Sequence, residues 1–595
     1  MKRYTSCSFR SPGSLSYRSK TNVPLGSIVS ISLRKQTVPG IVIACRSVAE
    51  AKSELKTASF ALSKSALETK SKLPLPVFKA AERIAQFHAA PVGSVLAALV
   101  ADVLPTELPT LSTGTAYKKY RVEGVHAKRV STYRSRIISA LEEKKATLLI
   151  VPTIAEIDVF KKEFSDFSPL ILASSLSAKK RNENLELALL HTGLIIATPS
   201  FAWTPIRSLG AIIAERVSAG TYVQPRRPYL DIRRALEELA TARSIPYTVG
   251  DYPLPLEERL HPENPLAAQP SAPRIILDTR SEKDRQREWE AIPKEIQEAI
   301  TATTAGGAGV LLLAVRKGYA PTVVCRDCGT AVTDTRGRTL SFTKVRGKNV
   351  FRSSDGVETL STDTTCVHCG SWNLYPLGVG VERVFDEAKK LFPTHHILHF
   401  DAATPPQARK LLKLITPTTI VVGTEYMLPW ITPTSSFGLA AIISADSLLS
   451  LPFWRARERF VRIGLMLAER AKRVIVATRK PEDTALEAIA DPTTTTFFSE
   501  ETALRKVLLY PPFGTLIHFS AEGRPEQLTA TVALLTERLQ QSLSVLPFQL
   551  SKPGIQHMSA VLHVKDTSWP NETLSEQIRS LPPSIRVRID TESLW

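Results

Sequence analysis

The sequence predicts an α/β protein with two consecutive parallel-sheet units and a metal-binding insertion in the second unit. Short apolar stretches alternate twice along the chain with segments of helical periodicity. This alternation is typical of buried parallel strands and the helices that cover them. Two Cys-x-x-Cys pairs interrupt the second series. A chain of 595 residues is long enough for several domains, so we expect smaller units at both ends.

Residues 1–109 are predicted to form a small β/α domain. Val23–Ala44 alternates apolar and polar residues, which predicts an antiparallel β unit with a tight turn near Pro39-Gly40. Leu73–Pro105 has apolar residues at helical spacing and is bounded by prolines, which predicts two helices. Residues 107–115 are rich in Pro, Thr, Ser and Gly and predict a linker.

Residues 110–282 and residues 283–324 with 379–498 are predicted to be two lobes. In the first lobe, strands are expected at Ala146–Thr153, Thr192–Ser200, Ser208–Arg216 and Ile245–Gly250. Helices are expected at Tyr133–Lys144 and Asn182–His191. In the second lobe, a helix is expected at Glu288–Thr303 and strands at Val310–Val315, His395–Asp401, Thr418–Thr424, Gly438–Asp446 and Arg473–Thr478. Residues 499–595 mix short strands with a helix near Leu528–Leu543, which predicts a C-terminal α+β domain.

Residues 325–378 are predicted to be a zinc-binding insertion. A Cys-x-x-Cys pair lets two thiolates face one ion, and two such pairs complete a tetrahedral site. A glycine follows each second cysteine, where the chain must fold back around the metal. We therefore expect one structural Zn²⁺. Its ligands would be Cys325, Cys328, Cys366 and Cys369.

The charge balance predicts a polyanionic partner. Lys and Arg number 76 against 57 Asp and Glu, so the net charge is +19. Such an excess most often indicates nucleic acid, and with two α/β lobes it suggests the RecA-like pair of a nucleic-acid motor. No apolar stretch approaches the length of a membrane span, and no signal-peptide pattern is present, so we expect no membrane association. The few cysteines suggest a reducing, cytoplasmic location.

Several stretches carry a family resemblance. They are Arg316–Gly329, Cys366–Pro393, Ala445–Phe460, Leu508–Phe519 and Val587–Leu594, together with the N-terminal β unit and paired helices. In order and motif they resemble the primosomal protein N′ family, the PriA replication-restart helicases, over nearly the whole chain. The resemblance implies two RecA-like helicase lobes, an N-terminal 3′-end DNA-binding domain, ATP with Mg²⁺ in active members, and eight cysteines binding two zinc ions. Only the outer four cysteines are present here, and in the family these bind one ion together.

The phosphate-binding loop of the family is not preserved. Its pattern is G-x-x-x-x-G-K-T, whose backbone N–H groups and lysine hold the nucleotide phosphates. The matching stretch, Val122–Ser135, keeps only Gly124. Val130 and Ser131 fall at the Lys and Thr positions, and Lys128 lies two residues early. These departures make the use of ATP and Mg²⁺ doubtful.

The other ATPase motifs of the family are also only partly preserved in this sequence. The Asp-Glu-x-His box of the family aligns with a segment that begins at Glu215 and Arg216. Glu215 could still reach a magnesium ion, whereas Arg216 cannot activate water. In the second lobe, the Gln-x-x-Gly-Arg-x-Gly-Arg motif keeps both arginines, Arg470 and Arg473, but not the glutamine or the glycines.

Candidate DNA contacts follow from the same resemblance. Lys56 matches the lysine of the 3′-end pocket, whereas the aromatic-acidic pair of that pocket is replaced. Arg34 and Lys35 lie at its loop, and Arg316 and Lys317 precede the first cysteine pair. A solvated surface role remains the alternative for the pocket residues.

Three functional hypotheses remain open. The sequence favours an ATPase-deficient protein that binds DNA forks or single strands as a scaffold in replication restart, with other replication-restart or single-strand-binding proteins as partners. The first alternative is an active 3′→5′ DNA helicase with a divergent nucleotide site. The second is a zinc-dependent interaction protein with no DNA role.

Overall fold

The computed structural model divides into two compact units. Unit 1 comprises Met1–Leu266 and Thr567–Leu581, and unit 2 comprises Ala267–Asp566 and Pro582–Trp595. The structure describes residues 2–8, 14–19, 23–33, 36–47, 69–100, 109–260, 272–280, 290–314, 322–334, 338–345, 348–353, 358–377, 379–400, 405–433, 437–449, 453–493, 495–552, 555–565 and 568–592.

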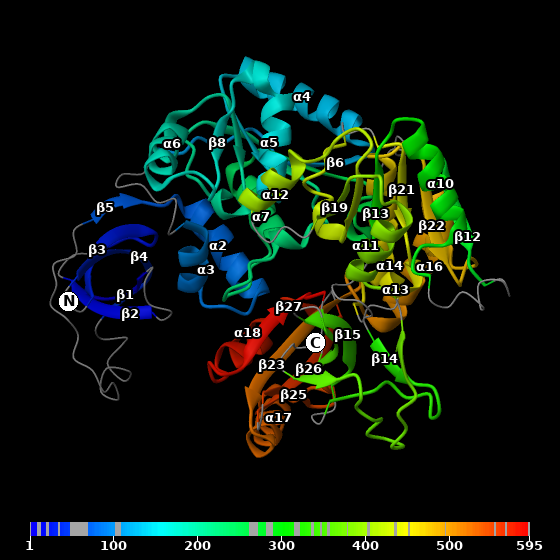
Figure 1. Cartoon of the computed structure of the whole chain (residues 1–595). Coiled ribbons are helices and arrows are strands. Elements are labelled where there is room, and N and C mark those ends of the chain that lie inside the picture. Colours follow the sequence, from blue (N-terminus) through cyan, green and yellow to red (C-terminus); the bar gives the residue numbers. More distant parts are fainter. Residues whose placement is uncertain are drawn as a thin grey trace. The chain divides into compact units, whose positions relative to one another are not determined.

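The N-terminal part of unit 1 is an antiparallel sheet in the order β2-β1-β4-β3-β5 (Figure 1). Its strands are β1 Lys2–Ser8, β2 Ser14–Ser19, β3 Ser27–Leu33, β4 Gln36–Ser47 and β5 Thr69–Lys72. The predicted turn near Pro39-Gly40 is wrong, because both residues lie inside β4 and pair with Ser30 and Val29. Pairing with β3 outweighs the local turn preference of the Pro-Gly sequence.

Two helices, α2 (Leu75–Phe87) and α3 (Val92–Val100), confirm the predicted helix pair. Their apolar faces join the same hydrophobic core as the helix α7 (Ile232–Arg243). The segment around α18 (Glu572–Arg579) belongs to unit 1, and its Ser575 hydroxyl donates to a carbonyl of α2. Among the described residues, no single helix is long and apolar enough to cross a membrane; α2 and α3, bent by 116°, pass that test only as a pair.

The first lobe is a six-stranded parallel sheet with the order β6-β11-β10-β7-β9-β8. Figure 1 draws this lobe in cyan to green. Its strands are β6 Lys118–Glu123, β7 Ala146–Ile150, β8 Leu170–Leu172, β9 Leu194–Ala197, β10 Leu209–Glu215 and β11 Pro246–Asp251. Its helices are α4 His126–Glu142, α5 Ile154–Glu163, α6 Ala178–Leu190, α7 and the short α8 Leu256–Arg259. The helix predicted at Tyr133–Lys144 therefore begins two turns earlier, at His126.

The second lobe repeats this arrangement with the order β12-β22-β21-β13-β20-β19. Its strands are β12 Arg274–Asp278, β13 Val310–Leu313, β19 Ile397–Phe400, β20 Ile420–Gly423, β21 Leu439–Ile442 and β22 Val474–Thr478. Its helices are α10 Lys294–Ala305, α11 Val381–Leu391, α12 Pro405–Leu412, α13 Ala445–Leu449, α14 Ala456–Ala468, α15 Thr484–Ala490 and α16 Thr496–Leu508. The predicted helix Glu288–Thr303 is thus observed from Lys294, directly after Pro293.

The insertion and the C-terminal part of unit 2 are mainly antiparallel. The insertion contains β14 Thr322–Cys325, β15 Leu340–Val345, β16 Lys348–Ser353, β17 Thr359–Ser361 and β18 Leu374–Leu377. The C-terminal sheet contains β23 Gly514–Gly523, β24 Ser544–Val545, β25 Gln549–Lys552, β26 Ile555–Lys565 and β27 Arg586–Ile589. Helix α17 runs from Pro525 to Leu539, which places the helix predicted near Leu528–Leu543 slightly earlier.

A buried ion network joins α14 to α16 inside unit 2. The guanidinium of Arg505 is fully buried and donates to Glu458 at 2.6 Å and to Glu501 at 2.9 Å. Burial alone raises the pKa of Glu458, but nearby arginines outweigh it and lower the pKa to about 2, namely Arg505, Arg455 and Arg462. At Glu501 burial outweighs the nearby Arg505 charge, so the pKa of Glu501 is raised.

This network predicts an acid-sensitive contribution to stability. Because the folded pKa of Glu458 lies below its ordinary value of 4.5, its contribution is present above about pH 5 and is lost as the pH falls towards 2. Glu501 has the opposite effect on stability. Because its pKa is raised in the folded state, its protonation as the pH falls favours the folded state. Urea unfolding of Glu458→Gln should therefore depend less on pH between 6 and 3 than wild type, with exposed Glu526→Gln as the control. Parallel curves for all three proteins would contradict this expectation.

Candidate metal centre and nucleotide-site positions

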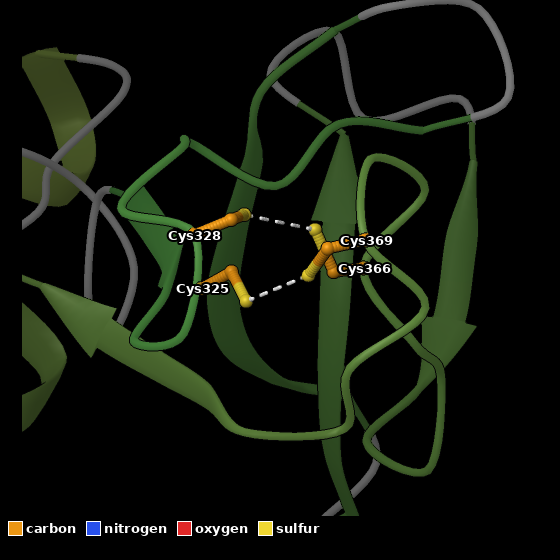
Figure 2. Close-up of side chains that lie close together, drawn as sticks. All are labelled: Cys325, Cys328, Cys366 and Cys369. Carbon is orange, nitrogen blue, oxygen red and sulfur yellow. Dashed lines mark hydrogen bonds between the residues drawn. The ribbon is translucent and has the colours of Figure 1, made fainter.

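The four predicted zinc ligands form one cluster (Figure 2). The Sγ atoms of Cys325 and Cys369 lie 3.5 Å apart, and those of Cys328 and Cys366 lie 3.7 Å apart. All four sulfur atoms lie within 4.8 Å of one another. Four thiolates around one zinc, each about 2.3 Å from the metal, would have sulfur atoms about 3.8 Å apart. The cluster therefore fits a tetrahedral metal ion.

Two equivalent turns hold these cysteines in place. The N–H of Gly329 donates to the Cys325 carbonyl at 2.9 Å, and the N–H of Gly370 donates to the Cys366 carbonyl at 2.8 Å. Both glycines have left-handed backbone angles, with φ of +71° and +75°, which explains why glycine follows each pair. The two turns are joined by Asp327, whose carboxylate accepts from the Asn373 amide at 2.8 Å and from Ser371.

Hydrogen bonds to sulfur favour the thiolate form at two of the cysteines. Burial raises the pKa of Cys366, but the backbone N–H groups of Cys369 and His368 more than compensate and lower it to about 6. The Thr330 hydroxyl, 2.8 Å from the Cys328 sulfur, lowers the pKa of Cys328. Because metals bind the thiolate rather than the thiol, the site is chemically suited to a thiophilic cation.

The stretch predicted to be a degenerate phosphate-binding loop is mostly helical. Strand β6 is joined to helix α4 by Gly124 and Val125 alone, and Gly124 has φ of +146°. Lys128, Val130 and Ser131 lie within α4, the first two half-buried and Ser131 exposed. The two-residue connection leaves no extended loop between strand and helix.

A buried cluster that the sequence did not predict lies beside this connection. Arg129 of α4 is 4% exposed and binds both carboxylate oxygens of Glu215, at 2.9 to 3.2 Å. Glu215, at the end of β10, is 2% exposed and also accepts the Tyr133 hydroxyl at 2.6 Å. Burial, and then the Glu215 charge, raise the pKa of Tyr133 well above its ordinary value. Gly250 is required next to this hydroxyl, because a Cβ there would lie 1.6 Å from it.

Arg216 forms a second ion pair at the same strand end. It has a left-handed backbone, with φ of +49°, and its guanidinium binds Glu156 at 2.7 and 3.1 Å. Burial lowers the pKa of Arg216, but Glu156 outweighs it and the pKa is raised overall. Asp251 of β11 accepts the backbone N–H of Ser218 at 2.7 Å. The carboxylates around the end of β10 are therefore engaged by groups of the protein itself.

Comparisons with known proteins show similarity to replication restart proteins. The model of a 3′ DNA-binding domain (3′BD) of PriA matches residues 7–101. The replication restart protein PriA of Bacillus subtilis is 23% identical over 423 residues, 67% of this chain and 52% of that protein. PriA of Thermotoga maritima is 23% identical over 484 residues, 77% of this chain and 65% of that protein. Over most of its length the chain is similar to PriA replication restart proteins.

The chain thus spans between half and two thirds of the length of these two PriA proteins. Among solved structures, one described as RecG bound to a three-way DNA junction covers 76% of the chain at 10% identity, with a TM-score of 0.35.

The insertion contains apolar packing where the PriA resemblance places four further cysteines. Strands β15, β16 and β17 form a sheet of their own. The rings of Phe342 and Phe351 pack at 5.7 Å between centroids, and Leu340 is fully buried beside them. This apolar cluster includes Cys325 and Cys366, so it packs directly against the four-cysteine cluster. The insertion contains no cysteines other than the four ligands.

The two arginines of the second-lobe motif have different surroundings. Arg470 is buried, and its guanidinium donates to the carbonyls of Ile431 and Met466, each at 2.7 Å. Its charge therefore helps to hold the second lobe together. Arg473, before β22, is exposed.

The five residues predicted to contact DNA are not among those that the structure describes. Arg34, Lys35, Lys56, Arg316 and Lys317 all lie outside the described residues. They remain predictions from the PriA resemblance.

Proposed function

We propose that this chain binds branched or single-stranded DNA in replication restart and acts there as an ATPase-deficient scaffold. The match to a 3′ DNA-binding domain in unit 1 carries the DNA-binding part of the proposal. The relatives named replication restart proteins and the net charge of +19 support it. The partners would be DNA forks and single strands, with other replication-restart or single-strand-binding proteins, in the cytoplasm.

The loss of ATP hydrolysis is supported by the Arg129–Glu215 pair. Hydrolysis needs a phosphate cradle, a bound metal and stabilisation of transition-state charge together. Here the carboxylate at the metal-binding position is paired on both oxygens with Arg129. The lysine position of the loop is Val130, and the connection to α4 is two residues long. ATP with Mg²⁺ does not fit these residues, so no catalytic step is assigned to them.

We also propose that the four-cysteine cluster holds one structural Zn²⁺. Zinc prefers a tetrahedral set of thiolates, and a closed four-ligand site is the arrangement of structural rather than catalytic zinc. The ion would hold the two cysteine turns together and brace the sheet of the insertion.

The test is an ATPase assay with and without forked DNA, run beside a fork-binding measurement. Wild type should show no DNA-stimulated turnover above background and should still retain forked DNA at low salt. Millimolar ATP with Mg²⁺ should leave the melting temperature unchanged, since an unbound ligand cannot stabilise the fold. Turnover by wild type that Glu215→Gln abolishes would instead support the active helicase. Failure to retain DNA would support the interaction protein without a DNA role.

A further inference from the structure

Two cations lie over a single aromatic ring at the edge of the first-lobe sheet. Tyr120 is on β6, which is an edge strand of that sheet. The Arg136 guanidinium carbon, from α4, lies 3.7 Å from the centre of the Tyr120 ring, and Nζ of Lys118 lies 5.1 Å from it. Both distances are within the range of cation–π attraction, which holds the cations near one another despite their like charge. We call Lys118, Tyr120 and Arg136 the Tyr120 patch.

The Tyr120 patch has no neutralising acid in the described part of the chain. No carboxylate there lies within ion-pair distance of Lys118 or Arg136, whereas most nearby cations are paired. Helix α4 contributes no Asp or Glu from His126 to Leu141. Lys118 is exposed, and Tyr120 and Arg136 are half-buried. The result is an accessible local excess of positive charge.

The opposite face of β6 also carries two cations, which can be compared with those of the Tyr120 patch. Lys119 and Arg121 alternate with the patch residues and so point to the opposite face of β6. There Lys119 binds Glu237 at 3.0 Å and Glu258 at 2.7 Å, and Arg121 binds Glu258 at 2.9 Å. One face of this strand is therefore neutralised within the protein, while the other has no counter-charge among the residues that the structure describes.

We propose that the Tyr120 patch is a binding site for the phosphate backbone of DNA. The inference rests on the proposed DNA-binding function and extends it to a surface of the first lobe away from the 7–101 match. Phosphate contacts come from lysine and arginine and fix the position of the DNA without reading its sequence. Holding Arg136 against the ring reduces the side-chain entropy lost when a phosphate binds.

The test measures the salt dependence of DNA binding by the full chain. Each phosphate contact contributes about −0.7 to the slope of log K against log salt for a single strand and about −0.9 for a duplex. The double variant Lys118→Gln/Arg136→Gln should therefore make the slope shallower by about 1.4 with an oligo(dT) strand or about 1.8 with a duplex. The two substrates show which form of DNA reaches the patch.

The matched control removes the same charge from the opposite face. Lys119→Gln/Arg121→Gln should leave the slope unchanged, and Lys118→Arg/Arg136→Lys should restore the wild-type slope. Circular dichroism confirms that each variant is folded. If Lys118→Gln/Arg136→Gln kept the wild-type salt slope, or if the control made the slope equally shallow, the Tyr120 patch would not be a phosphate site. The proposed DNA-binding function would be unaffected by that result. Absence of DNA binding by wild type would overturn the proposed function itself.

Discussion

Replacing Arg129 by methionine should lower the free energy of unfolding by about 3–5 kcal/mol. Removing one partner of a buried ion pair leaves the other charge without compensation in a medium that solvates it poorly. Glu215 would keep only the Tyr133 hydroxyl among the side-chain donors described for it. Denaturant unfolding monitored by circular dichroism measures the change. The control is Arg134→Met on the same helix, whose pair with the exposed Asp166 is screened by solvent and should change the free energy of unfolding far less.

A second substitution tests whether Arg129 acts through Glu215. The double variant Arg129→Met/Glu215→Gln should recover a large part of the loss, because no buried charge then remains unpaired. A coupling free energy of about 2 kcal/mol or more between the two positions is expected from the cycle. A loss below 1 kcal/mol in Arg129→Met, or simple additivity, would show that the pair does not hold unit 1 together.

The second large effect concerns the metal. Purified wild-type protein should contain about one zinc per chain, and Cys325→Ser should contain none, as measured by elemental analysis. Zinc binding to comparable four-ligand sites contributes about 10–16 kcal/mol to folding of small peptides, so the insertion should lose its ordered structure. Unit 2 should then become sensitive to proteolysis within the insertion, because no metal would hold the two cysteine turns together.

Cys45→Ser is the appropriate control for this loss. Cys45 is a half-buried cysteine of β4 in unit 1, outside the cluster. It should keep the full metal content and wild-type resistance to proteolysis. Two zinc ions per chain in the wild type would contradict the single site and point to ligands other than these cysteines.

Elements with an apolar signal were predicted well, and those that depend on polar residues were not. The central strands β7, β9, β10, β13, β20 and β21 are buried on both faces, so their sequences are continuous apolar stretches. Strand β6 was missed because Lys118, Lys119 and Arg121 mask its alternation, as is common at a sheet edge. Helix α4 begins earlier than predicted because His126 and Arg129 occupy inward-facing positions where apolar residues were expected.

The sequence by itself predicted the four-cysteine cluster and the similarity to PriA proteins. A Cys-x-x-Cys-Gly segment has its turn built into five consecutive residues, so its geometry is local and could be recognised without a fold. The tertiary structure alone decided what occupies the nucleotide-site positions. Arg129 and Glu215 are 86 residues apart, and neither belongs to a pattern that marks them as partners. Only the parallel sheet, which places the end of β10 near the start of α4, brings the guanidinium to the carboxylate and leaves that carboxylate engaged by the protein.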